Sequence, residues 1–432
     1  MLDVVRAFEV DGHRALIWEL EPVWRMYEAD PKAKPKVMSD LSVLLANLIR
    51  ANRIDLSIGM WANGLFSVTH PSVEGRLVPF FEAVRCPHVM FWLDAPQWAH
   101  SGTFRQHFGL PLLKSPALLS VINNPGTARE MTELLGFDSV LPRSYGVNES
   151  VFRPHADEKR EFDIVFGLGP GDPKPTPTML EELEKDEPDT ARIRHEQAER
   201  VTPEVAALLA KLPGDRVAPA AARELAHVLV TSQLASRDTP LLDRIDAVRR
   251  DADAPLAAAI DALRADPRLY VEVTMKVRLI ENWERAFTFA HLARRFRCAA
   301  FGTGSLAAWG ADTKHLGDLP YAGMARAYSR AAIGLNVMRW QDDQGLNLKP
   351  FEITASGAAC LCARRVGLDA LFDDDREIIA FATPGEARRK AGELLKAPER
   401  LRTIAEAGRA RTLHDHTWTA WTRDVVARIG VR

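Results

Sequence analysis

The chain has 432 residues, a length that favours two domains, with room for an insertion, over one. Its composition, 47% hydrophobic and 26% charged, is ordinary for a globular protein. Its formal net charge of −2 gives no electrostatic reason to expect nucleic acid or an anionic membrane as a partner. No stretch approaches the ~20 apolar residues of a membrane span, and the N-terminus lacks the pattern of a signal peptide. We therefore expect a cytoplasmic protein.

The four cysteines, Cys86, Cys298, Cys360 and Cys362, form no metal-binding pattern. A single residue separates the last two, and no cluster of histidine or cysteine accompanies them. We interpret all four as small buried hydrophobic residues in a reducing compartment.

In the first half, short apolar runs alternate with helical patterns, which predicts a parallel sheet with crossover helices. Residues 2–10 already read as a helix, so either the first strand is absent or the sequence begins inside the unit. The pattern then predicts strands at 13–20, 88–96 and 117–124, a strand with its loop at 55–64, and a strand with an irregular linker at 139–154. It predicts helices at 39–52, 78–86 and 127–135. We assign residues 1–155 to an N-terminal Rossmann-like domain.

The pattern restarts at Asp163 with a strand and a glycine-rich loop, and residues 156–432 form the second predicted Rossmann-like domain. Within it, residues 172–270 are rich in Ala, Glu, Asp and Arg and predict a helical insertion of three or four helices. Two of these are expected to begin at Thr202-Pro203 and Thr239-Pro240. For residues 172–200 a solvated coil stays open as an alternative.

After the insertion the α/β alternation resumes. The sequence predicts helices at 276–296, 351–357, 383–397 and 418–430, and strands at 297–302, 331–338, 358–365 and 377–382. The fold class is therefore α/β, with two wound units joined near 153–162.

Ligands of open α/β sheets bind beyond the carboxyl ends of the strands. Three loops of the second domain fall there: "GLGPGD" with Gly169, "GTGS" with Gly302 and Gly304, and "RWQDDQGLNLKP". Glycine loops leave backbone N–H groups free for a phosphate, although turn formation also explains such glycines.

Glu352 opens a run that is otherwise free of charge, since residues 353–363 contain no charged side chain. The run therefore predicts a buried helix with Glu352 and Lys349 at its start. A lysine suits a phosphate, and a carboxylate beside a diphosphate suits the diol of a ribose. Together these residues predict a nucleotide-diphosphate site.

From about Arg278 to its end, the chain resembles the donor domain of GT-B glycosyltransferases, in the CgeB-like branch. The matching motifs are "FGTG", "LPYAGMARAYSRAAIGLNV", "GLNLKPFEITASGA" and "LFDDDREIIAFATPGEARRKAGELL". "MFWLDAPQW" and "LPRSYGVNESVFRP" resemble the acceptor domain of that branch more loosely. The resemblance implies two Rossmann-like domains facing a cleft, a nucleotide-diphosphate sugar as donor, and no metal or other cofactor.

The resemblance also assigns donor-binding residues. Glu352 takes the position that binds the donor ribose, Gly357 closes the first turns of its helix, and Asn347 and Lys349 match an Asn-x-basic pattern. The basic residue facing the diphosphate is either Arg278 or Arg285, and the sequence does not decide between them.

At the position where retaining relatives often carry a second glutamate, this chain has Gln344, with Asp343 beside it. The branch therefore implies retention of stereochemistry, whereas this departure argues against it. Gln344 remains able to hydrogen-bond the donor sugar.

Candidates for the acceptor side come from the first domain. Asp94 ends an apolar strand and is interpreted either as a general base or as a loop cap. His100 and His107 are further candidate bases, each weighed against an ordinary loop histidine. The remaining candidates are aromatic and polar side chains that either line the cleft or pack in the core: Trp92, Trp98, Tyr145 and Asn148. Asp373 and Asp375 mimic a metal-binding Asp-x-Asp pair, but we interpret them as a solvated loop.

We therefore predict a metal-independent glycosyltransferase that moves a sugar to the hydroxyl of a glycan, protein or small molecule, with Asp94, Gln344 and Lys349 as catalytic residues. One alternative is a nucleotide-sugar epimerase on the same fold. Another is a non-catalytic scaffold that oligomerises or binds a partner through residues 172–270. Hydrolase and dehydrogenase functions have no supporting motif.

Overall fold

The computed structural model describes residues 1–19, 25, 34–65, 69–71, 75–98, 104–169, 173–341 and 343–430. Contacts divide the chain into two compact units. The first unit comprises Met1–Arg143 and Trp421–Arg432, and the second comprises Ser144–Ala420. The sequence analysis placed the boundary at residue 155 and left the whole C-terminus in the second domain, so residues 144–155 and the last twelve residues are assigned differently.

The first unit is built on a four-stranded parallel sheet in the order β1-β4-β5-β6. Every residue of its two central strands, β4 and β5, is buried, as expected for parallel strands covered on both faces. The strands of this sheet are β1 (Ser57–Met60), β4 (His88–Trp92), β5 (Leu118–Ile122) and β6 (Val140–Pro142). The unit also contains β2 (Thr69–Pro71) and β3 (Leu77–Pro79), which form a separate two-stranded sheet. Its helices are α1 (Leu2–Val10), α3 (Lys34–Asn52), α4 (Phe80–Val84), α5 (Pro125–Glu133) and the greater part of α17 (Trp418–Ile429), with 3₁₀ turns at Phe104–His107 and Pro111–Lys114.

The strand predicted at residues 13–20 is wrong for its described part, since residues 13–19 form no strand. Leu16 and Ile17 are more than half exposed there. A β-forming composition makes a strand only where a neighbouring strand supplies ladder hydrogen bonds, and this segment pairs with none among the described residues.

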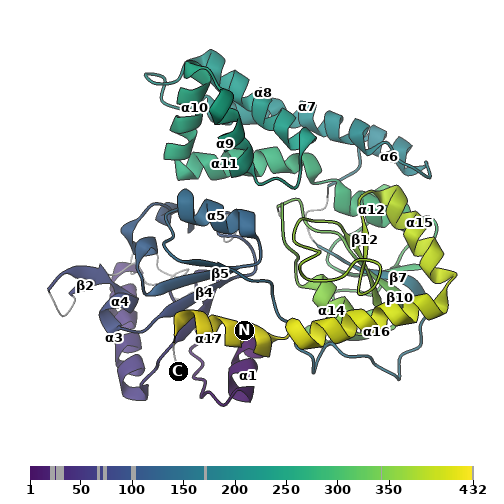
Figure 1. Ribbon diagram of the computed structural model, residues 1–432, viewed down its shortest axis with the longest axis horizontal. Coiled ribbons are helices and arrows are strands. Elements are labelled where there is room, and N and C mark those ends of the chain that lie inside the picture. The colour runs from purple at the N-terminus through teal and green to yellow at the C-terminus, as the bar shows by residue number, and fades with distance from the viewer. Residues whose placement is uncertain are drawn as a thin grey trace. The chain divides into compact units, whose positions relative to one another are not determined.

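The second unit has a six-stranded parallel sheet in the order β12-β11-β10-β7-β8-β9. Its strands are β7 (Phe162–Leu168), β8 (Cys298–Gly302), β9 (Lys314–His315), β10 (Ala331–Asn336), β11 (Ala359–Ala363) and β12 (Ile379–Phe381). The helices around the sheet are α12 (Glu284–Ala293), α13 (Tyr321–Ser329), α14 (Lys349–Ala355), α15 (Pro384–Leu395) and α16 (Pro398–Asp415), with a 3₁₀ turn at Ala307–Trp309. One apolar core joins one face of the sheet to α12 and α15, and a second joins the other face to α13 and α14 (Figure 1).

The insertion between β7 and β8 contains six helices rather than three or four. They are α6 (Pro177–Leu183), α7 (Thr190–Leu209), α8 (Pro219–Ala235), α9 (Leu241–Asp251), α10 (Ala254–Ala265) and α11 (Pro267–Arg278). Because α6 and α7 occupy most of residues 177–200, the solvated-coil alternative for this segment is wrong.

Two helix boundaries differ from the predicted ones. Pro203 does not begin a helix but lies inside α7, whereas α9 does begin directly after Thr239-Pro240. The single helix expected at 276–296 is divided into the end of α11, a 3₁₀ turn at Leu279–Glu281, and α12.

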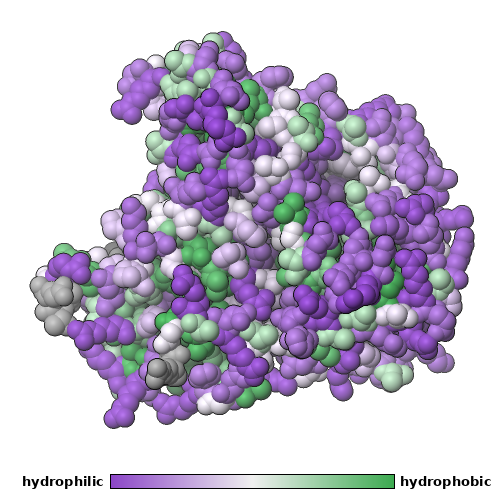
Figure 2. Space-filling view, viewed as in Figure 1, coloured by the Kyte–Doolittle hydropathy of each residue, from purple (hydrophilic) through white to green (hydrophobic). Residues whose placement is uncertain are grey.

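The first two insertion helices belong to the core of the second unit. Met179, Leu183 and Ile193 are each at most 1% exposed and join the same apolar cluster as Phe287 of α12. The surface that Figure 2 shows over α15, at the outer side of this unit, is mostly hydrophilic. The buried contacts of α6 and α7 therefore make the insertion part of the fold of this unit.

Candidate functional site

Helix α14 carries the predicted ribose-binding carboxylate. Asn347 Oδ1 accepts a hydrogen bond from the Lys349 backbone N–H at 3.0 Å, and Pro350 stands in the first turn, where its missing N–H is not needed. Glu352 is only 2% exposed. Its Oε2 lies 2.7 Å from Lys349 Nζ, so the two predicted donor-binding residues form an ion pair.

Lys349 links this pair to the neighbouring strand. Its Nζ lies 5.9 Å from the centre of the Phe301 ring, a cation–π contact, and its side chain is 33% exposed. Phe301 belongs to β8, and its ring lies where a Cβ on Gly167 of β7 would approach to 3.2 Å. The lysine, the carboxylate and the ends of β7 and β8 thus lie at one edge of the sheet.

Three predicted glycines are required by close backbone packing. A Cβ on Gly302, where φ is +103°, would lie 2.1 Å from the Leu168 carbonyl oxygen. A Cβ on Gly304 would lie 2.6 Å from the Gly169 carbonyl oxygen. At Gly357, φ is +80° and a Cβ would lie 2.9 Å from the Pro154 ring. The loops after β7 and β8 therefore pack against each other. Close packing by itself requires a glycine at these three positions, and a phosphate-binding role for Gly302 and Gly304 stays a prediction.

Gly169 has different neighbours, because two guanidinium groups lie beside it. A Cβ there would lie 3.3 Å from Arg339 Nη2 and 3.4 Å from Arg285 Nη2. Arg285 Nη2 also donates to the Gly167 carbonyl at 2.9 Å. Arg339 is exposed, and no ion pair joins it to a carboxylate in the described parts of the chain. A glycine loop with two adjacent arginines can bind an anion.

Arg278, the other basic candidate, is committed to an ion pair. It is 1% exposed and donates to both carboxylate oxygens of Asp343, with Nε at 3.0 Å from Oδ1. Asp343 is itself 3% exposed. A buried guanidinium bound bidentately to a carboxylate is unsuited to a phosphate, so the geometry favours Arg285 over Arg278.

Gln344 faces the helical insertion. Its Nε2 donates to the Asp238 carbonyl at 3.3 Å, in the turn between α8 and α9, and its backbone forms an isolated parallel bridge with Val366. The side chain lies at the carboxyl edge of the sheet, as expected.

A buried charge cluster lies next to Gln344. Glu284, at the start of α12, accepts hydrogen bonds from Arg237 of the insertion and, at 2.8 Å, from Arg365 directly after β11. Burial alone would raise the pKa of Glu284, but the two guanidinium groups outweigh it and lower that pKa to about 2. The carboxylate is therefore ionised at neutral pH.

Two acceptor-side candidates of the first unit have opposite exposures. Asp94 is exposed in the bend after β4, at the carboxyl end of that strand. Trp92 is fully buried: its Nε1 donates to Ser120 Oγ at 3.3 Å, and its ring packs on Phe104. Trp92 is therefore a core residue, which corrects its assignment as an acceptor-binding residue. His100 lies outside the described residues.

The other acceptor candidates are engaged locally. His107 Nδ1 lies 3.2 Å from the Phe104 carbonyl oxygen. Tyr145 is 3% exposed and belongs to the second unit, and Asn148 Oδ1 accepts from the N–H and the hydroxyl of Ser150. Tyr145 and Asn148 are thus buried, whereas His107 is half-buried, and an acceptor-side role for these residues stays a prediction.

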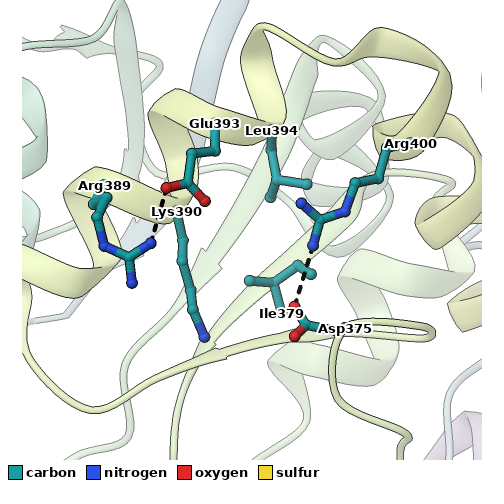
Figure 3. Close-up of a pocket in the computed structure, with 7 residues that line it drawn as sticks. All are labelled: Asp375, Ile379, Arg389, Lys390, Glu393, Leu394 and Arg400. Atoms are coloured by element: carbon teal, nitrogen blue, oxygen red, sulfur yellow. Dashed lines mark hydrogen bonds and ion pairs between the residues drawn. The ribbon is translucent and has the colours of Figure 1, made fainter.

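The Asp-x-Asp pair, Asp373 and Asp375, lies in the loop before β12, at the amino end of that strand. Asp373 pairs with Arg376, and Asp375 pairs with Arg400 at 3.3 Å. Asp375 also lines a pocket with Ile379, the first residue of β12, and with side chains of α15 (Figure 3). Because this pocket lies where β12 begins, it is separated by the length of the strand from the edge that carries Glu352. Among the described residues, no group of three or more His, Cys, Asp or Glu could hold a metal ion.

Sequence reasoning missed Arg339, Arg365, Arg237 and Asp238. The first two had a usable signal: Arg339 directly follows the strand predicted at 331–338 and Arg365 is the last residue of the strand predicted at 358–365, so both belong to the carboxyl edge. Arg237 and Asp238 had no such signal in the sequence, because nothing in the local pattern of the insertion shows which residues of the sheet its turns contact.

Two Rossmann-like units with parallel sheets define the α/β class. Residues 278–427 match the family described as glycosyl transferase-like, and no curated protein matches the sequence. This match confirms the predicted glycosyltransferase class for that segment, while the CgeB-like branch stays a prediction. None of the described helices is long and apolar enough to cross a membrane.

Solved structures support the fold. The glycosyltransferase from Rickettsia africae ESF-5 is 10% identical with a TM-score of 0.51, over 100% of this chain and 94% of that chain. Sucrose-phosphate synthase from Thermosynechococcus elongatus is 10% identical with a TM-score of 0.45, over 92% and 79%. Anabaena HepE in complex with UDP and glucose is 9% identical with a TM-score of 0.42, over 92% and 82%. Only the similarity to the Rickettsia africae structure has a TM-score high enough to bear on the fold, and that similarity agrees with the predicted GT-B class.

Proposed function

We propose that the protein transfers a sugar from a nucleotide-diphosphate sugar to an acceptor hydroxyl, with the donor bound at the carboxyl edge of the second sheet. The observation that carries this proposal is the combination at that edge of a buried carboxylate, Glu352, with the cations Lys349, Arg285 and Arg339. A carboxylate suits a ribose diol, and the cations suit a diphosphate.

The same cations serve the chemistry. When the bond between the sugar and the diphosphate breaks, negative charge develops on the departing phosphate oxygen. Lys349, Arg285 and Arg339 are placed to stabilise that charge, together with the loop amides beside Gly169. We propose that this set of cations does so without a metal ion. Asp94, exposed at the end of β4, is the candidate to take the proton of the acceptor hydroxyl.

The proposal is tested by calorimetric titration of UDP, GDP and dTDP into the wild type and the variants Arg285→Ala and Arg339→Ala. One nucleotide is expected to bind, with a loss of affinity of about tenfold or more in each variant, because a hydrogen bond to a charged group is removed. Arg389→Ala, which removes a cation of the pocket at the beginning of β12, is the matched control and should bind as the wild type does.

Transfer is then measured as release of the nucleotide diphosphate from its sugar derivative in the presence of candidate acceptors. An epimerase would change the sugar without releasing the nucleotide. If no nucleotide binds, or if only Arg389→Ala weakens binding, the proposed function is wrong.

A further inference from the structure

The turn between α8 and α9, residues 236–240, contacts two elements at the carboxyl edge of the second sheet directly. Arg237 binds Glu284, the first residue of α12, and the Asp238 carbonyl accepts from Gln344 on the loop after β10. Glu284 in turn binds Arg365, directly after β11. The helical insertion thus supplies polar groups to the edge of the sheet where the donor is proposed to bind, although its Arg237 is 47 residues away in the sequence from Glu284.

The turn is braced from within. The hydroxyls of Ser236 and Thr239 lie 2.5 Å apart, and Arg244 Nε donates to the Thr239 carbonyl at 3.0 Å. Arg244, in α9, is only 5% exposed, and its Nη2 lies 2.6 Å from Gln233 Oε1 of α8. Side chains on a turn fixed in this way are preorganised, as a binding site requires.

Two groups of the turn are left unsatisfied in the part of the chain that the structure describes, an acceptor on Asp238 and a donor on Arg237. Asp238 Oδ1 is enclosed, yet it has no hydrogen-bond partner among the described residues. Burial raises the pKa of the Asp238 carboxyl above its ordinary value. The guanidinium groups whose charge acts on it, Arg237 and Arg365, donate to Glu284, and Arg237 Nη2 and Arg365 Nε are themselves enclosed without a partner in the described ranges. An enclosed acceptor without a donor is unfavourable, and a ligand hydroxyl would relieve it.

Charge counting indicates what kind of ligand group fits. The cluster contains as many acidic side chains, Glu284 and Asp238, as basic ones, Arg237 and Arg365, so it does not call for the negative charge of a further phosphate or carboxylate. The guanidinium groups of Arg285 and Arg339 lie beside Gly169 instead. An uncharged group that donates hydrogen bonds therefore fits beside Asp238.

We propose that the turn between α8 and α9 binds the glycosyl group of the donor, with Asp238 accepting a hydrogen bond from a hydroxyl of an uncharged sugar. This inference rests on the proposed function, in which Glu352 binds the nucleotide and Arg285 and Arg339 bind the diphosphate of the same donor. It makes Asp238 a specificity-determining residue and gives the insertion a role in donor selection.

The test compares nucleotides with nucleotide sugars. UDP, GDP, dTDP, UDP-glucose, GDP-mannose and dTDP-glucose are titrated calorimetrically into the wild type and Asp238→Ala. The variant should bind the nucleotide diphosphate as the wild type does but lose about tenfold or more in affinity for its sugar derivative. Asp215→Ala is the matched control, because Asp215 lies in the turn between α7 and α8 with its side chain 77% exposed.

The outcomes separate this inference from the proposed function. If the wild type binds none of the six compounds, both are wrong. If the wild type binds but Asp238→Ala keeps the ratio of sugar-nucleotide to nucleotide affinity, only the role of Asp238 is wrong. Asp238→Asn, which preserves the size of the side chain, allows the same ratio to be measured if the alanine variant does not fold.

Discussion

Two ionisable groups at residues 349 and 352 show how burial and charge combine at this site. Glu352 is 2% exposed and has Lys349 Nζ as its partner at 2.7 Å, so its charge is balanced while one face of the pair, the partly exposed lysine, stays accessible. A buried ion pair adds little net stability by itself. A pair retained within a helix that is otherwise apolar is therefore better explained by ligand binding than by folding.

The pair of Arg278 and Asp343 has the opposite character, since both side chains are enclosed. Asp343→Ala should lower the free energy of unfolding by about 3–5 kcal/mol, because it leaves a guanidinium buried without its counter-ion. Urea denaturation measures this loss. Asp261→Ala, which breaks the exposed pair with Arg249, should cost less than about 1 kcal/mol. Equal losses in the two variants would show that Arg278 is accessible to solvent, contrary to this structure.

At the scale of elements, sequence patterns succeeded where local physics decides. The buried helix around Glu352 followed from a run without charges, and β4, β5, β7 and β10 followed from apolar runs. Helix α7 did not follow the pattern, because Pro203 normally begins or breaks a helix. Here Val205 and Leu209 beyond the proline are fully buried, and this packing keeps the helix continuous.

Pro203→Ala should therefore stabilise the protein. Proline inside a helix costs about 3 kcal/mol, and the greater flexibility of alanine in the unfolded chain offsets part of the gain, which leaves about 2 kcal/mol. Denaturation in urea measures this gain. Pro267→Ala is the matched control and should give no gain, because Pro267 stands at the start of α11, where proline is tolerated. An unchanged or lower stability in Pro203→Ala would mean that the proline itself contributes favourable packing.

At the scale of the molecule, the insertion is part of the second unit and not an appendage. Its helices α6 and α7 share a core with α12, and its Arg237 shares Glu284 with Arg365. Deleting residues 172–270 would expose that core, so a deletion cannot by itself separate a scaffolding role from catalysis. The sequence predicted the existence of the insertion from its composition. Its contacts with the sheet depend on residues far apart in the chain, which no local pattern encodes.

Glu284 should make the second unit sensitive to acid. Its pKa is about 2 in the folded protein against 4.5 ordinarily, so its contribution to stability is present above pH 4.5 and is lost as the pH falls from 4.5 towards 2. Glu284→Gln should therefore be destabilised at pH 7, and its difference from the wild type should shrink at pH 3. Urea denaturation at the two pH values measures this. Glu393→Gln, on the exposed pair with Arg389, is the control. A difference that does not change with pH would contradict the assignment of the charge to Glu284.

The central claim is that Glu352 binds the ribose of a nucleotide-diphosphate donor. The measurement that tests it most directly is calorimetric titration of the nucleotide diphosphate that binds best, and of its 2′,3′-dideoxy analogue, into the wild type and Glu352→Ala. Two hydrogen bonds to a charged group, at about 1.5–3 kcal/mol each before compensation by water, predict a loss of about tenfold or more for the ribonucleotide. The variant and the wild type should bind the dideoxy analogue equally, and Glu399→Ala, at an exposed position of α16, should change neither affinity. An equal loss of affinity for both ligands in Glu352→Ala, or no loss for either, would contradict the claim.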